Sequence, residues 1–219
     1  MTRVSSLVGL AVAATLLTGC GAVPDLNPGT AVRVDDTTYS LDEVADLAGD
    51  YCDAVRTQLQ EGEMVANAVI NSQVAGSLAL RAAAEQFAGE EGVSPDATYE
   101  QAQQQLDASI AELTADQQEA VRDVNLARPY AEAVQVAVGK QGGAGDDEAL
   151  GAGQQTFADW LSDQDVRIDP RFSVSVADGA IASSDTSVSY SVSSTARSGA
   201  SAEPDPTYAA GLPQTQRCG

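Results

Sequence analysis

The stretch AVRVDDTTYSLDEV, residues 31–44, carries the signals for two strands and the start of a helix. Residues 31–34 and 37–39 are rich in β-branched and aromatic side chains, and the two aspartates between them are typical of a turn. Ser40 is followed three residues later by Glu43, which is the spacing of a capping box at a helix N-terminus. The stretch therefore predicts a short N-terminal β-hairpin that leads directly into a helix.

The chain beyond this hairpin has the apolar spacing of a helical body. From Leu41 to Leu59, apolar side chains recur mostly at intervals of three and four residues, as on the buried face of a helix. Further helices are predicted at residues 64–87, at residues 95–110, from a second capping box at Thr114 to Val138 with a kink at Pro129, and at residues 146–161. The sequence thus predicts a mainly α fold with a helical body of about five helices.

The sequence changes character after the last predicted helix. Residues 166–172 alternate between apolar and polar side chains, which predicts one strand after the helices. The next segment is rich in serine, alanine, glycine and aspartate, and its runs at 173–176 and 188–192 are the best candidates for weak strands. Because the segment has little apolar surface to bury, we expect instead a largely unstructured, low-complexity and flexible tail over residues 173–219.

The N-terminus has the layout of an export signal. Arg3 precedes an apolar run at residues 7–17, and small residues then lead to Cys20. The run is shorter than the roughly 20 apolar residues of a membrane-spanning helix. An ordinary secretory signal peptide that happens to lie near a cysteine is one interpretation. The sequence LTGC at residues 17–20, however, resembles the lipobox of bacterial lipoproteins, and we favour this second interpretation.

The lipobox resemblance implies a lipid anchor. It implies that residues 1–19 are a signal peptide, that cleavage falls between Gly19 and Cys20, and that the Cys20 sulfur carries a diacylglycerol. One acyl chain binds a membrane only marginally, whereas two or more give a stable anchor. Residues 20–30, with prolines and glycines that disfavour regular structure, are then expected to tether the domain at the extracytoplasmic face of the cell membrane.

With Cys20 assigned to the lipid, two cysteines remain, Cys52 and Cys218. An exported chain meets an oxidising environment, where an even pair of cysteines favours a disulfide over two separate thiols. A loop that closes most of the chain stabilises the fold by about 5 kcal/mol in the chain-entropy model. We therefore expect a Cys52–Cys218 disulfide that holds the C-terminus to the first helix.

The composition excludes several classes of function. The chain of 219 residues has 11 basic and 32 acidic side chains, a net charge of −21 and no histidine. Such a charge argues against binding nucleic acid and against lying flat on an anionic membrane. The lack of histidine excludes Ser-His-Asp and Cys-His catalysis and any His-ligated metal. We therefore expect no cofactor, no metal and no catalytic residues, and a site of paired carboxylates is the remaining enzymatic alternative.

The order of these features resembles the N-terminal domain of SurA-type chaperones. The quoted stretch at 31–44, the helices after it and the segment VRIDPRF at 166–172 correspond to the strand pair, helices and closing strand of that family. The resemblance covers residues 31–172 and implies binding of unfolded exported polypeptides. SurA and PrsA usually also carry a parvulin domain, whose site usually contains histidines. This chain departs there, because it lacks histidine and its residues after Phe172 are few and polar, so we expect no prolyl isomerase activity.

A holding chaperone needs an exposed apolar groove rather than a catalytic group. The candidates for contact with a polypeptide are the larger aromatic side chains of the helices, Phe87, Tyr99, Tyr130, Phe157 and Trp160. Packing in the core is the alternative for each of them, and an exposed apolar patch has to be large before it indicates binding. Two hypotheses follow: a holdase for unfolded or secreted polypeptides, and a structural or adaptor lipoprotein that binds one folded envelope protein.

Overall fold

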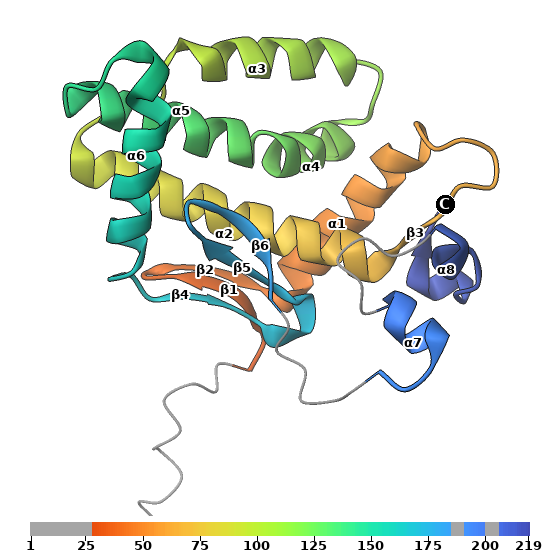
Figure 1. The fold of residues 1–219 in the computed structure, drawn as a ribbon. Helices are drawn as coiled ribbons and strands as arrows, with labels where there is room; N and C mark the ends of the chain where they lie inside the picture. Colours follow the sequence, from red (N-terminus) through yellow and green to blue (C-terminus); the bar gives the residue numbers. More distant parts are fainter. Residues whose placement is uncertain (1–27, 185–190, 200–205) are drawn as a thin grey trace, which may run out of the picture.

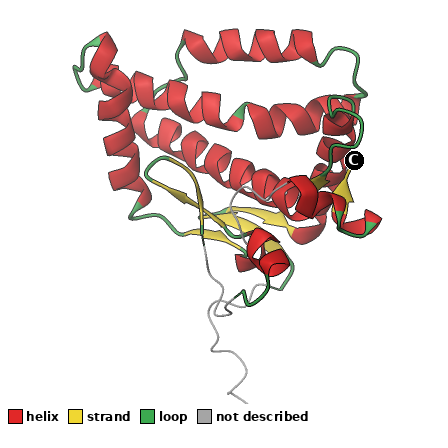
Figure 2. Ribbon diagram, turned by 45° about the vertical axis from the view of Figure 1, so that its right-hand side comes forward, coloured by secondary structure: helices red, strands yellow, loops and turns green. Residues whose placement is uncertain are grey.

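The computed structural model describes residues 28–184, 191–199 and 206–219, and within them the protein is mainly helical, as the sequence predicts (Figure 1). The signal and anchor residues, including Gly19 and Cys20, lie outside the described residues. Figure 2 shows most of the strands gathered on one side of the helical body. None of the helices in the described ranges is long and apolar enough to cross a membrane.

The helices of the described chain are α1 (Leu41–Arg56), α2 (Asn67–Glu91), α3 (Ala97–Ser109), α4 (Ala115–Asn125), α5 (Ala127–Gln141), α6 (Asp146–Leu161), α7 (Ser194–Gly199) and α8 (Pro206–Ala210). The strands are β1 (Thr30–Val34), β2 (Thr37–Ser40), β3 (Val65–Ala66), β4 (Val166–Ile168), β5 (Val174–Ala177), β6 (Ala180–Ser183) and β7 (Arg217–Cys218). They form an antiparallel sheet in the order β2-β1-β4 and the separate pairs β3-β7 and β5-β6. Short 3-10 helices cover Pro170–Phe172 and Gln214–Gln216.

The predicted hairpin and its helix start are confirmed. β1 pairs with β2 across a turn in which Asp35 adopts a positive φ of 47°. The Ser40 hydroxyl accepts a hydrogen bond from the Glu43 N–H at 3.1 Å, and the Glu43 carboxylate accepts one from the Ser40 N–H at 2.7 Å. Both partners of the capping box are therefore in place at the start of α1. β1 begins at Thr30, the last residue of the expected tether, and residues 20–27 of that tether lie outside the described residues.

The central helix α2 organises the body. It lies between α4 and α5 on one side and the strands β1 and β5 on the other (Figure 1). α2 starts at Asn67 rather than near residue 64, because Val65 and Ala66 pair with the C-terminal strand β7. It continues past Phe87 and ends at Gly92, whose φ of 66° places it in the left-handed region that glycine adopts readily.

The helix predicted from Thr114 to Val138 is two helices, which corrects the expectation of one kinked helix. The capping box at Thr114 is present and starts α4. α4 ends at Asn125, four residues before Pro129, and α5 begins at Ala127. A proline in a helix clashes with the carbonyl of the residue four positions before it and lacks the N–H that would bond to that carbonyl. Pro129 therefore sits in the first turn of a new helix, where its missing N–H is not needed.

The expectation of a largely unstructured tail is wrong for residues 174–183. These residues form the hairpin β5-β6, with Asp178 and Gly179 at positive φ of 50° and 77° in the turn. The apolar side chains of Val174, Val176 and Ile181 pack against the core, which gives the hairpin a buried face. Residues 194–199 and 206–210 are the short helices α7 and α8. The other suggested strand, 188–192, falls mostly outside the described residues.

The strand predicted over residues 166–172 is also shorter than expected. β4 ends at Ile168, and Asp169 then caps the 3-10 helix by accepting a hydrogen bond from the Arg171 N–H at 2.9 Å. The proline after Asp169 supplies no N–H for a strand ladder but fits the first position of a helical turn. This turn buries Phe172 and brings the chain from the sheet to the hairpin β5-β6.

Candidate functional site

Three of the five predicted contact residues form part of the core between α2 and α6. Phe87 and Phe157 are fully buried, and their ring centroids lie 5.0 Å apart. Trp160 is half-buried and stacks on Phe157 at a centroid distance of 5.6 Å, and its Nε1 donates a hydrogen bond to the Glu90 carboxylate at 2.8 Å. In this arrangement the two phenylalanines present no surface to a polypeptide.

The other two predicted contact residues, Tyr99 and Tyr130, are held by Arg81. Their rings meet edge to face with centroids 5.2 Å apart. The Arg81 guanidinium lies 3.7 Å from the Tyr130 ring centroid and donates a hydrogen bond to the Tyr99 hydroxyl at 3.0 Å. An arginine over an aromatic face is attracted by the negative charge density of the ring. The two tyrosines therefore already contact a cationic side chain of the protein, that of Arg81. Burial raises the pKa of the Tyr130 hydroxyl.

A groove of about 1330 Å³ lies along the first half of α2, and we call it the α2 groove. Its other walls come from the α4–α5 junction, the 3-10 helix after β4, strand β6 and the C-terminal segment around α8 (Figure 1). The lining residues used below are Asn67, Asn71, Ser72, Ser77, Asn125, Arg128, Arg171, Ile181, Ser183 and Thr215.

Hydrogen bonds join the walls of the α2 groove to one another. The Ser72 hydroxyl donates to the Phe172 carbonyl at 2.5 Å, and the Ser77 hydroxyl donates to the Val124 carbonyl at 3.2 Å. The Asn67 amide donates to the Thr215 carbonyl at 3.2 Å. Three polar side chains of α2 thus tie it to the 3-10 helix, to α4 and to the C-terminal segment, so the groove has a defined shape.

Tyr51 of α1 supports the same groove from behind. Its hydroxyl donates a hydrogen bond to the Asn125 side chain at 3.0 Å and accepts one from the Gln73 amide at 3.2 Å. Burial raises the pKa of Tyr51, so the phenol remains protonated and able to donate at neutral pH. Asn125, which lines the groove, is therefore fixed in orientation by a buried side chain.

The charge of the α2 groove differs from that of the chain. The protein has 32 acidic residues, yet among the residues that the structure describes no acidic side chain lines this groove, whereas Arg128 and Arg171 do. Arg171 pairs with Asp169 at 3.1 Å, and its side chain is 59% exposed. Arg128 is exposed on the first turn of α5 and makes no hydrogen bond or ion pair with a described residue. The groove is thus a site that favours a neutral or anionic ligand.

A second cavity of about 740 Å³ lies between the sheet and β5, and it also contains arginines. Its arginines already have partners within the protein, since Arg33 and Arg167 both pair with Asp165, at 3.9 and 2.6 Å. Asp169 lies in its lining beside Arg171. We therefore take the α2 groove, whose Arg128 has no such partner among the described residues, as the candidate functional site.

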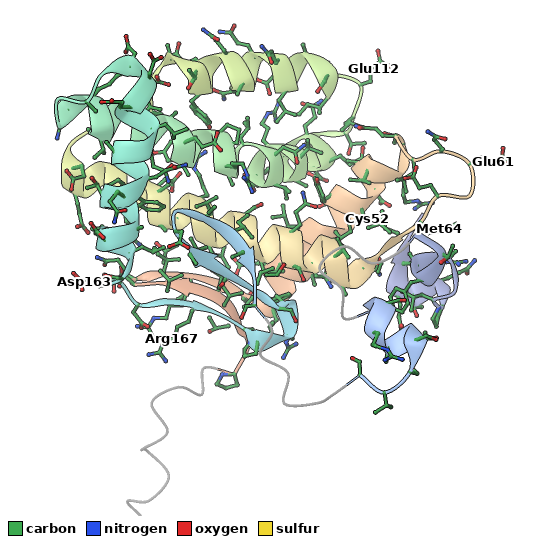
Figure 3. All side chains as sticks on the ribbon, in the orientation of Figure 1. Cys52, Glu61, Met64, Glu112, Asp163 and Arg167 are labelled. Carbon is green, nitrogen blue, oxygen red and sulfur yellow. A yellow bond between two sulfur atoms is a disulfide. The ribbon has the colours of Figure 1, made fainter. Side chains whose placement is uncertain are left out.

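The disulfide fixes one end of the α2 groove. The structure joins Cys52 of α1 to Cys218 of β7, with a Cα–Cα distance of 5.7 Å. β7 pairs with β3, immediately before α2, and the residues leading to β7 line the groove. Figure 3 shows Cys52 and Met64 on the side of the molecule where the chain ends. The pair predicted from the cysteine count therefore holds the C-terminal wall against α1 and α2.

Sequence reasoning did not find the α2 groove, although one signal was available. No charged residue occurs from Met64 to Leu80, in a chain of which 20% is charged. A second uncharged run covers residues 206–216, and both runs contribute walls to the groove. Within the described residues, no group of three or more acidic or cysteine side chains lies close enough together to hold a metal ion.

Comparison of this chain with protein-family models, with curated proteins and with solved structures finds no match. The resemblance to SurA-type domains and to lipoproteins stays a prediction from the sequence.

Proposed function

We propose that this protein is a membrane-anchored extracytoplasmic lipoprotein that acts as a non-enzymatic adaptor for one envelope partner. The observation that carries the proposal is the α2 groove, a large cavity with hydrogen-bonded walls in a chain of net charge −21. Its described lining contains two arginines and no acidic residue. A groove of fixed shape and distinct charge suits a selective interaction. The proposal keeps the lipid on Cys20 and the tether as its means of attachment.

The exposed surface supports an adaptor over a general holdase. Among the described residues, the large hydrophobic side chains that are exposed are Leu150 at 36% and Val192 at 89%. They belong to α6 and to the segment before α7, so they do not combine into one patch along a single element. A holdase for unfolded chains needs a broad apolar area, because its clients share only their exposed apolar side chains.

The experiment is photo-crosslinking in cells that make the full chain. A crosslinking amino acid replaces Asn71 in the α2 groove. A matched control carries it at Glu112, which lies in the turn between α3 and α4 (Figure 3) and does not line the groove. We expect one repeated partner from the groove position and none from the control. Many unrelated exported chains would instead support the holdase, and an empty capture from both positions would overturn the adaptor.

The anchor is tested separately by metabolic labelling with an alkyne fatty acid. We expect the wild-type chain to incorporate the label and to sediment with membranes. The Cys20→Ser variant should lose the label and leave the membrane fraction, because the thioether-linked lipid can no longer form. A labelled Cys20→Ser variant would contradict the assignment of the lipid to this cysteine.

A further inference from the structure

The outer edge of β6 carries backbone groups that the hairpin leaves unpaired. The Ser184 N–H donates to the Ser173 carbonyl at 2.8 Å, so the adjacent pair Val174 and Ser183 is of the non-hydrogen-bonded type. Because the two types alternate along an antiparallel ladder, Ile181 also belongs to a non-hydrogen-bonded pair. The N–H and C=O groups of Ile181 and Ser183 therefore point away from β5.

This edge of β6 borders the α2 groove. Ile181 and Ser183 line the groove together with Val174 of β5, whereas the second cavity is lined by Val174, Ser175 and Val176 of β5 and by no residue of β6. The outward backbone groups of Ile181 and Ser183 make no hydrogen bond to any described residue. Among the described strands, β6 pairs with β5 alone. Its second edge therefore carries donors and acceptors at the spacing that an extended polypeptide backbone would match.

The hairpin is held rigidly enough to present this edge. The Ile181 side chain packs on α2 at Gly76, where an added Cβ would lie 2.8 Å from Ile181 Cγ2. At the turn, the buried Gln135 amide donates to the Gly179 carbonyl at 3.2 Å. Both contacts lie at the turn end of β6, and both connect the hairpin to the helical body.

We propose that the α2 groove binds an extended, acidic polypeptide segment of the partner by strand addition to β6, with a carboxylate of the segment at Arg128. The proposal rests on the adaptor function above. β6 has only four residues and offers few main-chain hydrogen bonds. The affinity therefore has to include side-chain contacts. Among the described residues, the groove offers an arginine without an ion-pair partner and no carboxylate that would repel the segment.

The test uses fluorescein-labelled peptides of about eight residues, which span roughly 26 Å as a strand. Glutamate alternates with threonine or valine in one set, and glutamine replaces glutamate in the matched set. Anisotropy titrations with the purified full chain should show the acidic set binding roughly fivefold or more tightly than the glutamine set. Equal binding of the two sets, or no binding at millimolar peptide, overturns the proposal.

Two acidic peptides that differ in the position of backbone N-methyl groups test the strand addition without altering the protein. Because alternate residues of a strand point their N–H groups to opposite edges, methylation of one alternate set should reduce binding by about tenfold or more, and methylation of the other set should leave it unchanged. If both isomers bind alike, the peptide does not add to β6 as a strand.

The role of Arg128 is tested with Arg128→Glu and the matched control Arg56→Glu. Arg56 is exposed on α1, where it pairs with Asp53, so the control makes the same change in net charge outside the groove. We expect Arg128→Glu to weaken the acidic set by roughly fivefold or more and to leave the glutamine set unchanged. Equal effects of the two variants would mean that net charge, and not Arg128, determines binding.

Two further measurements separate the possible outcomes. Sedimentation velocity without peptide tests whether a second copy of this chain occupies the groove. A dimer that dissociates in the Arg128→Glu variant would overturn the proposal that a partner segment binds there. In the cell assay, undiminished capture of a single partner by the Arg128→Glu chain would leave the adaptor function standing and overturn the contact at Arg128. If the acidic peptides bind more tightly than the glutamine peptides but crosslinking in cells captures no partner, the binding preference of the groove stands and the adaptor function is overturned.

Discussion

The contact between α5 and α6 predicts opposite effects for two neighbouring glycines of α6. A Cβ added to Gly153 would overlap the carbonyl oxygen of Gln135 and lie 2.9 Å from the Gln135 Cα, whereas ordinary contacts of a Cβ begin at 3.4 Å. Gly151 lies two residues earlier on the same helix, and nothing lies within 4 Å of a Cβ added there. Gly153→Ala therefore pushes two helix backbones apart, while Gly151→Ala fills open space.

The magnitudes follow from packing and helix propensity. Overpacking of an interior costs about 1–3 kcal/mol, and the upper end applies because the opposing atoms of Gln135 are backbone and cannot rotate away. Alanine in a helix is favoured over glycine by about 1 kcal/mol. We expect Gly151→Ala to stabilise the protein by about 1 kcal/mol and Gly153→Ala to destabilise it by about 2 kcal/mol net.

The assay is urea and thermal unfolding of the three chains, followed by circular dichroism. A net loss of 2 kcal/mol corresponds to a midpoint lower by about 4–8 °C for a chain of this size. Gly151→Ala is the control for helix propensity, since both variants make the same chemical change on one helix. If Gly153→Ala unfolds at or above the wild-type midpoint, α5 and α6 do not approach as closely as the structure has them.

Three further perturbations have expected outcomes. Replacing both Cys52 and Cys218 with serine should lower the free energy of unfolding by about 5 kcal/mol, because the disulfide closes a loop of 166 residues, and hydrogen exchange should show lost protection at the C-terminus. Arg81→Met should cost about 1–2 kcal/mol in urea unfolding, because it removes the cation over the Tyr130 ring. Asp123→Asn should raise stability at neutral pH, since burial, followed by the nearby Glu119 carboxylate, raises the pKa of Asp123. Because the pKa of Asp123 is higher in the folded state, its contribution to stability is most favourable below the unfolded pKa of 3.8 and becomes less favourable as pH rises through the folded pKa. The stability advantage of Asp123→Asn should therefore vanish in acid.

Each of these expectations has a result that would contradict it. Unchanged stability after loss of the disulfide would mean that Cys52 and Cys218 do not constrain the unfolded chain. Equal stability of Arg81→Met and wild type would mean that the arginine over Tyr130 contributes nothing. An Asp123→Asn variant that is less stable at neutral pH would mean that the carboxylate is stabilised by its surroundings, and Glu112→Gln on an exposed turn is the control for loss of a charge.

The parts of the fold that the sequence predicted depend on local signals. The hairpin and the start of α1 are encoded within residues 31–44, where propensity, turn residues and a capping box agree. The division between α4 and α5 was not predicted, because Pro129 indicated a kink within one helix. Its effect falls four residues earlier, at the Asn125 carbonyl, since that is the carbonyl a proline in a helix would clash with.

The hairpin β5-β6 was missed because its composition resembles that of a disordered segment. Serine and alanine dominate it, and its buried face consists of three apolar side chains that find their partners on α2. The turn did carry a signal, since Asp178-Gly179 is a typical pair for a two-residue hairpin loop. Valines at alternate positions before that turn, Val174 and Val176, complete the pattern of a strand with one buried face.

The α2 groove could not be predicted from spacing, because its walls come from α2, the α4–α5 junction, β6 and the C-terminal segment. Its Arg128 and Arg171 lie on different elements, and only the fold brings them to one cavity. The disulfide was predictable from the cysteine count, but its contribution to the groove was not, since that depends on β7 pairing with β3 next to α2.

The net charge of the chain and the charge of the groove act over different distances. The negative charge of the whole domain repels an acidic segment at long range, but salt screens this repulsion beyond about 8 Å at physiological ionic strength. A carboxylate at Arg128 acts at contact distance, where screening is much weaker. The overall charge therefore discourages non-specific association with other anionic surfaces, and the α2 groove can still favour an acidic segment whose backbone also matches the open edge of β6. Selectivity on this account depends on both features together, because a segment that meets only one of them gains either the carboxylate contact or the strand pairing but not both.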